Sequence, residues 1–140
     1  MISVYDTLYA IANDKSLVLF KTIALGRGDS RILISRLDLT RKPYYSRISK
    51  LINAGLIRRK NGKYFLTSFG RIVYEAQDLI GNAVRCSSNL KAIDSIETPE
   101  IPAEERSKII DTLINNSKIK EILVSPERNN NYIAAEKEKA

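Results

Sequence analysis

Residues 39–74 read LTRKPYYSRISKLINAGLIRRKNGKYFLTSFGRIVY, and this segment determines the fold that we expect for the chain. It holds nine Lys or Arg and no Asp or Glu, in a chain of 140 residues with 23 basic and 16 acidic side chains. The rest of the chain therefore has 14 basic against 16 acidic residues and is slightly negative. A fold does not require this segregation of charge, whereas a surface that binds a polyanion would produce it.

The first half of the segment has the period of a helix, which we expect over residues 41–54. Thr40 is a suitable N-cap residue, and Gly55 suits the position just after a helix. A shorter helix is expected over residues 31–37, so that two helices joined by a short turn form a helix-turn-helix. The expected core-facing stripe of the second helix recurs at spacings of four and three, at Tyr44, Ile48 and Leu51.

The second half of the segment has the pattern of a β-hairpin. Asn61-Gly62 is a strong signal for a two-residue hairpin loop, because both positions of a type I′ turn require positive φ. The loop length then sets the register of the strands. The expected pairs are Lys60 with Lys63, Arg59 with Tyr64, and Ile57 with Leu66.

This order of elements resembles the winged helix-turn-helix domain of regulators of the MarR and ArsR kinds, over residues 29–75. The composition, rich in Ile and Lys, is similar to that of archaeal one-domain regulators. The resemblance implies a recognition helix at about 41–54 and a wing at 58–63. The chain differs from metal-sensing ArsR-type repressors because it has one Cys and no His. The resemblance rests on Leu39-Thr40, the helix stripe, Ala54-Gly55-Leu56-Ile57, and Leu66-Thr67 with Gly70.

If the stripe faces the core, the opposite side of the recognition helix is free to contact DNA, since successive residues are about 100° apart. Such a helix fits the major groove, and a wing would reach the minor groove or the backbone. The candidate base-reading residues are Lys42, Tyr45, Ser46 and Ser49, and the candidate phosphate-binding residues of the helix are Arg41, Arg47 and Lys50. The wing adds Arg58, Arg59, Lys60, Asn61, Gly62 and Lys63 to the candidate DNA-binding residues.

The remainder of the chain is expected to be helical. From Ile72 to Ile93 apolar residues alternate at spacings of four and three, which is typical of a helical seam in one long helix. Gly81 and Ser87-Ser88-Asn89 weaken this helix and are the expected places for a bend. With the C-terminal helices this seam is expected to form a homodimer interface, and an intramolecular core is the open alternative. The expected domains are a DNA-binding domain at 1–75, a helical extension at 76–124 with helices at 103–115 and 118–124, and a disordered tail at 125–140.

Composition excludes several classes of function. Without His the chain lacks the commonest general base and metal ligand, and its one Cys, Cys86, cannot form an internal disulfide. No apolar run approaches the ~20 residues that span a bilayer, and the N-terminus has no apolar signal segment. We therefore expect a cytoplasmic protein that is not an enzyme and has no cofactor, metal or membrane partner.

Together the patterns predict a mainly α-helical fold with a small β-hairpin. The leading functional interpretation is a dimeric transcriptional regulator that binds double-stranded DNA sequence-specifically. Two alternatives stay open: a winged-helix module for protein–protein interaction, and a protein that binds chromatin or RNA without sequence preference. The operator, the regulated genes, the sign of regulation and any effector are not encoded in these patterns.

Overall fold

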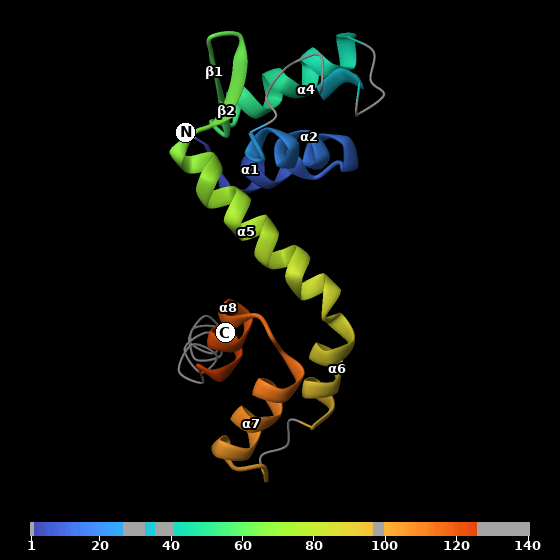
Figure 1. Ribbon diagram of the computed structural model, residues 1–140, viewed down its shortest axis with the longest axis vertical. Coiled ribbons are helices and arrows are strands. Elements are labelled where there is room, and N and C mark those ends of the chain that lie inside the picture. Colours follow the sequence, from blue (N-terminus) through green and yellow to red (C-terminus); the bar gives the residue numbers. More distant parts are fainter. Residues whose placement is uncertain (1, 27–32, 36–40, 97–99, 126–140) are drawn as a thin grey trace, which may run out of the picture. The chain divides into compact units, whose positions relative to one another are not determined.

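The computed structural model describes residues 2–26, 33–35, 41–96 and 100–125. It is mainly helical, with one small antiparallel sheet of two strands (Figure 1). The chain forms two compact units, Met1–Gln77 and Asp78–Ala140. No helix in this described part is long and apolar enough to cross a membrane. The elements are α1 (Val4–Ile11), α2 (Asp14–Ala24), α4 (Arg41–Asn53), β1 (Ile57–Lys60), β2 (Lys63–Leu66), α5 (Ser68–Arg85), α6 (Ser87–Ile96), α7 (Ala103–Leu113) and α8 (Ser117–Val124).

The N-terminal residues form two helices because each has its own cap. Ser3 accepts a hydrogen bond from the amide of Asp6 at 2.9 Å, and the Asp6 carboxylate accepts from the amide of Ser3, which completes a capping box. Asn13 caps α2 by accepting from the amide of Lys15 at 3.0 Å. The buried side of α1 consists of Thr7, Ala10 and Ile11.

The core of the first unit lies between α1, α2, α4 and the hairpin (Figure 1). The stripe predicted for α4 is confirmed: Tyr44 and Leu51 are completely buried, and Ile48 nearly so. The ring of Phe20 on α2 packs edge-on against Tyr74 on α5, with 6.3 Å between centroids. The other completely or nearly buried apolar residues of this core include Leu19, Ile23, Leu33, Leu56, Ile57 and Tyr64.

A glycine turn ends α4 and leads directly into the hairpin. Gly55 has a φ of 75°, in the left-handed region where a side chain is disfavoured. The amide of Leu56 donates to the carbonyl of Leu51 at 3.0 Å, and that of Gly55 to the carbonyl of Ile52 at 2.9 Å. This pair of bonds is a Schellman motif, and the burial of both leucines supplies its hydrophobic contact.

The predicted hairpin is confirmed in turn and register. Asn61 and Gly62 have φ values of 53° and 77°, as a type I′ turn requires. Because side chains alternate across a strand, this register gives the hairpin two different faces. The observed pairs are Ile57 with Leu66, Arg58 with Phe65, Arg59 with Tyr64, and Lys60 with Lys63.

The start of α5 is fastened to the base of the hairpin. The Thr67 amide donates to the Leu56 carbonyl at 3.1 Å, and its hydroxyl donates to the carbonyl of Gly55. The same hydroxyl accepts from the amide of Gly70 at 2.9 Å and so caps the helix. Gly70 is buried, and a Cβ there would lie 1.9 Å from the Leu56 carbonyl oxygen. Only glycine allows this approach of α5 to the strand.

In the second unit, most of the predicted seam forms an intramolecular core. The buried residues of this core lie in α6, in α7 and just after it, and in α8. From Leu79 onward the seam therefore packs within the chain, which was the alternative to a homodimer interface. The expected single helix is interrupted at Cys86, between α5 and α6, next to the Ser87 position where a bend was expected. The residues that pack together are Leu79, Ala83, Cys86 and Leu90 with Ile93, Ile110, Ile114 and Ile119.

Several expectations fall outside the described residues. The turn at 38–40, with its Thr40 cap, is one of them, and the tail at 126–140 is another. Of the helix expected at 31–37, residues 33–35 are described and are helical. The observed α7 and α8 agree with the two expected C-terminal helices to within two residues at each end.

Candidate nucleic-acid interface

The outward side of α4 carries polar and basic side chains. Burial of Tyr44 and Leu51 fixes the rotation of the helix, so the residues on the opposite side are held at the surface. The ring of Tyr45 packs edge-on against that of Tyr44, with centroids 5.0 Å apart. This contact restricts the rotation of the exposed Tyr45 side chain. Arg41 begins α4, and its side chain lies outside the described part of the chain. The exposed members of the predicted set are Lys42, Tyr45, Ser46, Ser49 and Lys50.

The cations of α4 and the hairpin are not neutralised by neighbours. Apart from Arg47, none of their described side chains forms a hydrogen bond or ion pair with another described residue. A surface with exposed cations and no acid between them keeps its full positive field. Six side chains contribute to this field, and we call them the basic surface: Lys42, Lys50, Arg58, Arg59, Lys60 and Lys63.

The register divides the predicted hairpin residues between two faces. Arg58 lies on the same face as Lys60 and Lys63, whereas Arg59 lies on the other, opposite Tyr64. Asn61 and Gly62 form the exposed tip. The same face as Arg58 also carries Phe65, and a hollow beside it is lined by Arg58, Lys60, Asn61, Lys63, Phe65 and Leu66.

Phe65 is a residue of this surface that the sequence interpretation did not include. It is directly paired with Arg58 and is 42% exposed. An exposed aromatic ring among cations can stack on a base or a sugar. The signal was present in the alternation of the strand, because the expected register already placed Phe65 opposite Arg58.

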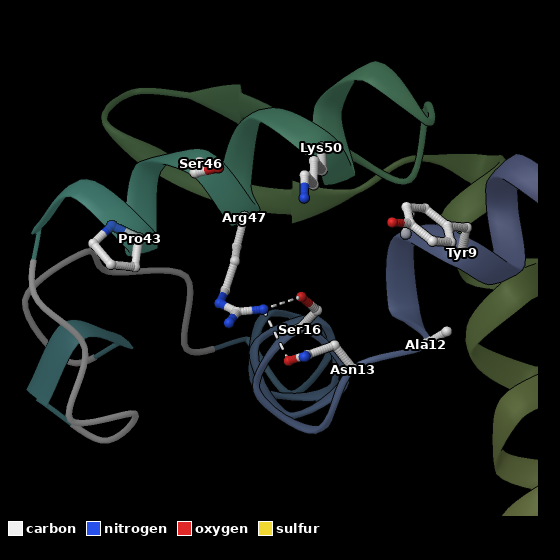
Figure 2. Close-up of a pocket in the computed structure, with 9 residues that line it drawn as sticks. Tyr9, Ala12, Asn13, Ser16, Pro43, Ser46, Arg47 and Lys50 are labelled. Carbon is white, nitrogen blue, oxygen red and sulfur yellow. Dashed lines mark hydrogen bonds between the residues drawn. The ribbon is translucent and has the colours of Figure 1, made fainter.

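Arg47 differs from the other predicted cations because its side chain turns inward. Figure 2 shows it extending from α4 toward the beginning of α2, where its Nη1 donates to Asn13 Oδ1 at 2.8 Å and to Ser16 Oγ at 2.9 Å. Ser16 is buried, and Asn13 is the N-cap of α2. Arg47 therefore braces α4 against α2, and its predicted phosphate contact stays a prediction.

A pocket of about 360 Å³ lies where α4 faces the junction of α1 and α2 (Figure 2). From α4 it is lined by one flank of the helix, which includes three of the predicted DNA-binding residues, Ser46, Arg47 and Lys50. The remaining lining residues are Tyr9, Ala10, Ala12, Asn13, Ser16 and Pro43.

The described residues offer no obvious metal centre. They contain no group of three or more His, Cys, Asp or Glu side chains that could hold a metal ion. No protein-family model matches the chain, and no curated protein and no solved structure is significantly similar to it.

Proposed function

We propose that the chain is a winged helix-turn-helix protein that binds double-stranded DNA sequence-specifically and regulates transcription. The observation that carries the proposal is the basic surface, whose six cations are exposed and unpaired within the described residues. These cations come from two consecutive elements that contain no acid. Binding of a duplex would replace the missing counter-charges with phosphates.

The proposed roles follow from the direction of the side chains. An α-helix fits the major groove, so Lys42, Tyr45, Ser46 and Ser49 would lie against base edges. The Schellman turn joins α4 to β1 through three residues, which restricts where the hairpin can lie relative to the helix. Lys50 and the hairpin cations would contact phosphates, which position the protein without reading sequence.

The proposal includes a homodimer, although the packing of the second unit narrows the surface available for one. Residues from Leu79 onward on the seam are used within the chain. Large apolar side chains remain exposed on the part of α5 that belongs to the second unit, with Ile80 at 59% and Val84 at 66% exposure. Their spacing of four residues brings them to one side of the helix. We assign the dimer contact to this side of α5.

Selection of bound sequences from a random duplex pool tests the proposal. We expect a defined motif to be enriched, and an inverted repeat with half-sites about one helical turn apart if two chains bind together. The variant Ser46→Ala/Ser49→Ala should change the enriched motif, since these side chains face the bases. Lys60→Ala should weaken binding to all sequences alike and leave the motif unchanged. A selected pool with the same composition as the starting pool would contradict sequence-specific binding and favour general chromatin or RNA binding.

A protein–protein interaction module is the second candidate, and one observation favours it. The outer side of α1 is apolar and exposed, with Val4 at 77% and Tyr5 at 72% exposure, followed by Leu8 and Tyr9 one turn later. The rings of Tyr5 and Tyr9 are stacked, with 5.8 Å between centroids. Contiguous apolar patches of this kind often mark contacts with other proteins. A partner that is retained in excess random duplex DNA, while no DNA binds, would support this candidate over the first.

A further inference from the structure

The pocket between α4 and the α1–α2 junction has the size of a small-molecule site. Its volume of about 360 Å³ is at the lower end of the range for such pockets, roughly 300–1,000 Å³. It is built within the first unit by three helices, and four residues of α4 contribute to it: Pro43, Ser46, Arg47 and Lys50. Their spacing of three, one and three residues places them along one flank of the helix.

The charge of the lining is positive. Arg47 and Lys50 are the ionised residues among the described side chains that line the pocket, and none of these side chains is a carboxylate. The two groups that accept hydrogen bonds from Arg47, the Asn13 amide oxygen and the Ser16 hydroxyl, are both neutral. They therefore orient the guanidinium but do not neutralise it.

Part of the Arg47 guanidinium is also left without a partner. Its Nε is buried and has no hydrogen-bond acceptor among the described residues. A partly buried cation without a counter-ion is unfavourable, because hydrogen bonds from Nη1 to two neutral groups replace only part of the lost hydration. Lys50 likewise has no hydrogen bond or ion pair with a described residue. An anion between the two cations would supply the missing charge.

The other lining residues fit an organic anion. Hydroxyl groups of Tyr9, Ser16 and Ser46 can donate to anionic oxygens, and small apolar side chains provide contact for a carbon skeleton. An adjoining pocket shares Tyr9 and Lys50 and adds one carboxylate, Asp6. That carboxylate already accepts from the amide of Ser3 in the α1 capping box.

We propose that this pocket binds the phosphate or carboxylate group of a small anion between Arg47 and Lys50. The same chemistry has two sources, a free small molecule and a phosphate of the DNA backbone. The second source rests on the proposed DNA-binding function, whereas anion binding as such does not. Because Ser46 and Lys50 belong to both surfaces, an anion here changes the part of α4 that would face DNA.

Titration of the full chain with inorganic phosphate, at constant ionic strength and followed by amide chemical shifts in NMR, tests the proposal. We expect saturable shifts at Asn13, Ser16 and Arg47. Lys50→Gln should weaken phosphate binding at least about tenfold, since it removes one of two charges in contact with the anion. Lys21→Gln makes the same charge change on the exposed end of α2 and should have no effect. Absence of shifts at the pocket, or equal weakening by both variants, would overturn the proposal.

A second variant addresses the bracing role of Arg47. Arg47→Lys keeps the charge but loses the planar fork, so phosphate binding should weaken while the chemical-shift pattern of a folded protein is retained. Wild-type phosphate affinity in this variant would show that the guanidinium is only a structural brace and would overturn its assigned role in the site.

Adding duplex DNA to the phosphate-loaded protein distinguishes the two sources. If DNA displaces the phosphate and reverses the chemical-shift changes at the pocket, a backbone phosphate is identified as the natural occupant. Retention of phosphate in the DNA complex would identify a free small anion. If no DNA binds at all, the proposed function fails, and the phosphate titration still decides whether the pocket is an anion site.

Discussion

Removing the two lysines at the hairpin tip should weaken DNA binding through charge alone. Lys60 and Lys63 form the last pair of the two strands, both are exposed, and neither pairs with a described residue. The double variant Lys60→Ala/Lys63→Ala leaves the type I′ turn at Asn61 and Gly62 intact. We therefore expect no loss of stability and a specific loss of phosphate contacts.

The structure sets the magnitude of this effect. If each of the six cations of the basic surface neutralises one phosphate, the log–log slope of affinity against salt is about −5 per bound chain, at about 0.9 per contact. Removing two contacts reduces the slope to about −4. Between 50 and 200 mM salt, wild-type affinity should fall by about 10³, and that of the double variant by only about 10².

Fluorescence anisotropy of a labelled duplex across that salt range measures both slopes. The matched control is Lys91→Ala/Lys108→Ala, which makes the same change in net charge at exposed positions of α6 and α7. The control should keep the wild-type slope, because counterion release depends on local contacts rather than total charge. Equal slopes for the two double variants, or a flat response of the wild type, would refute the reasoning.

Two further predictions concern the packing that holds α4 and α5, and urea unfolding measures both. Tyr44→Ala should cost about 3–5 kcal/mol because the side chain is completely buried, whereas Tyr45→Ala should cost less than about 1 kcal/mol; similar losses would show that the α4 stripe is misassigned. Gly70→Ala should cost about 3 kcal/mol or more, because its Cβ would lie 1.9 Å from the Leu56 carbonyl oxygen. Gly81→Ala, also on α5, meets nothing closer than 3.9 Å and should be neutral or stabilising by up to about 1 kcal/mol, so a large loss there would contradict the geometry.

Local patterns predicted the elements that carry the proposed function. The stripe of α4 followed from apolar spacing, and the hairpin followed from Asn61-Gly62, since a turn that needs two positive φ values strongly selects these residues. The Schellman turn at Gly55 likewise depends on residues within one helical turn. Such features depend on residues that are close together in the sequence, so the local sequence is sufficient to predict them.

The helical seam shows that spacing does not specify which element covers an apolar side. Spacings of four and three from Ile72 to Ile93 indicate an apolar side of a helix, and they are the same whether a second chain or a later helix covers it. The structure supplies the cover for Leu79 and the residues after it, from α7 and α8. Ile72 stays exposed. No local pattern specified this packing.

The sequence by itself determined the charge segregation, the outward side of α4 and the order of helix and hairpin. Only the tertiary structure decided what Arg47 does. Helical periodicity placed it on the flank of α4 as a further cation for DNA, while its hydrogen-bond partners, Asn13 and Ser16, lie 34 and 31 positions away along the chain. A contact over that separation depends on how α2 packs against α4, and it places a side chain that is predicted to contact DNA in the wall of a pocket.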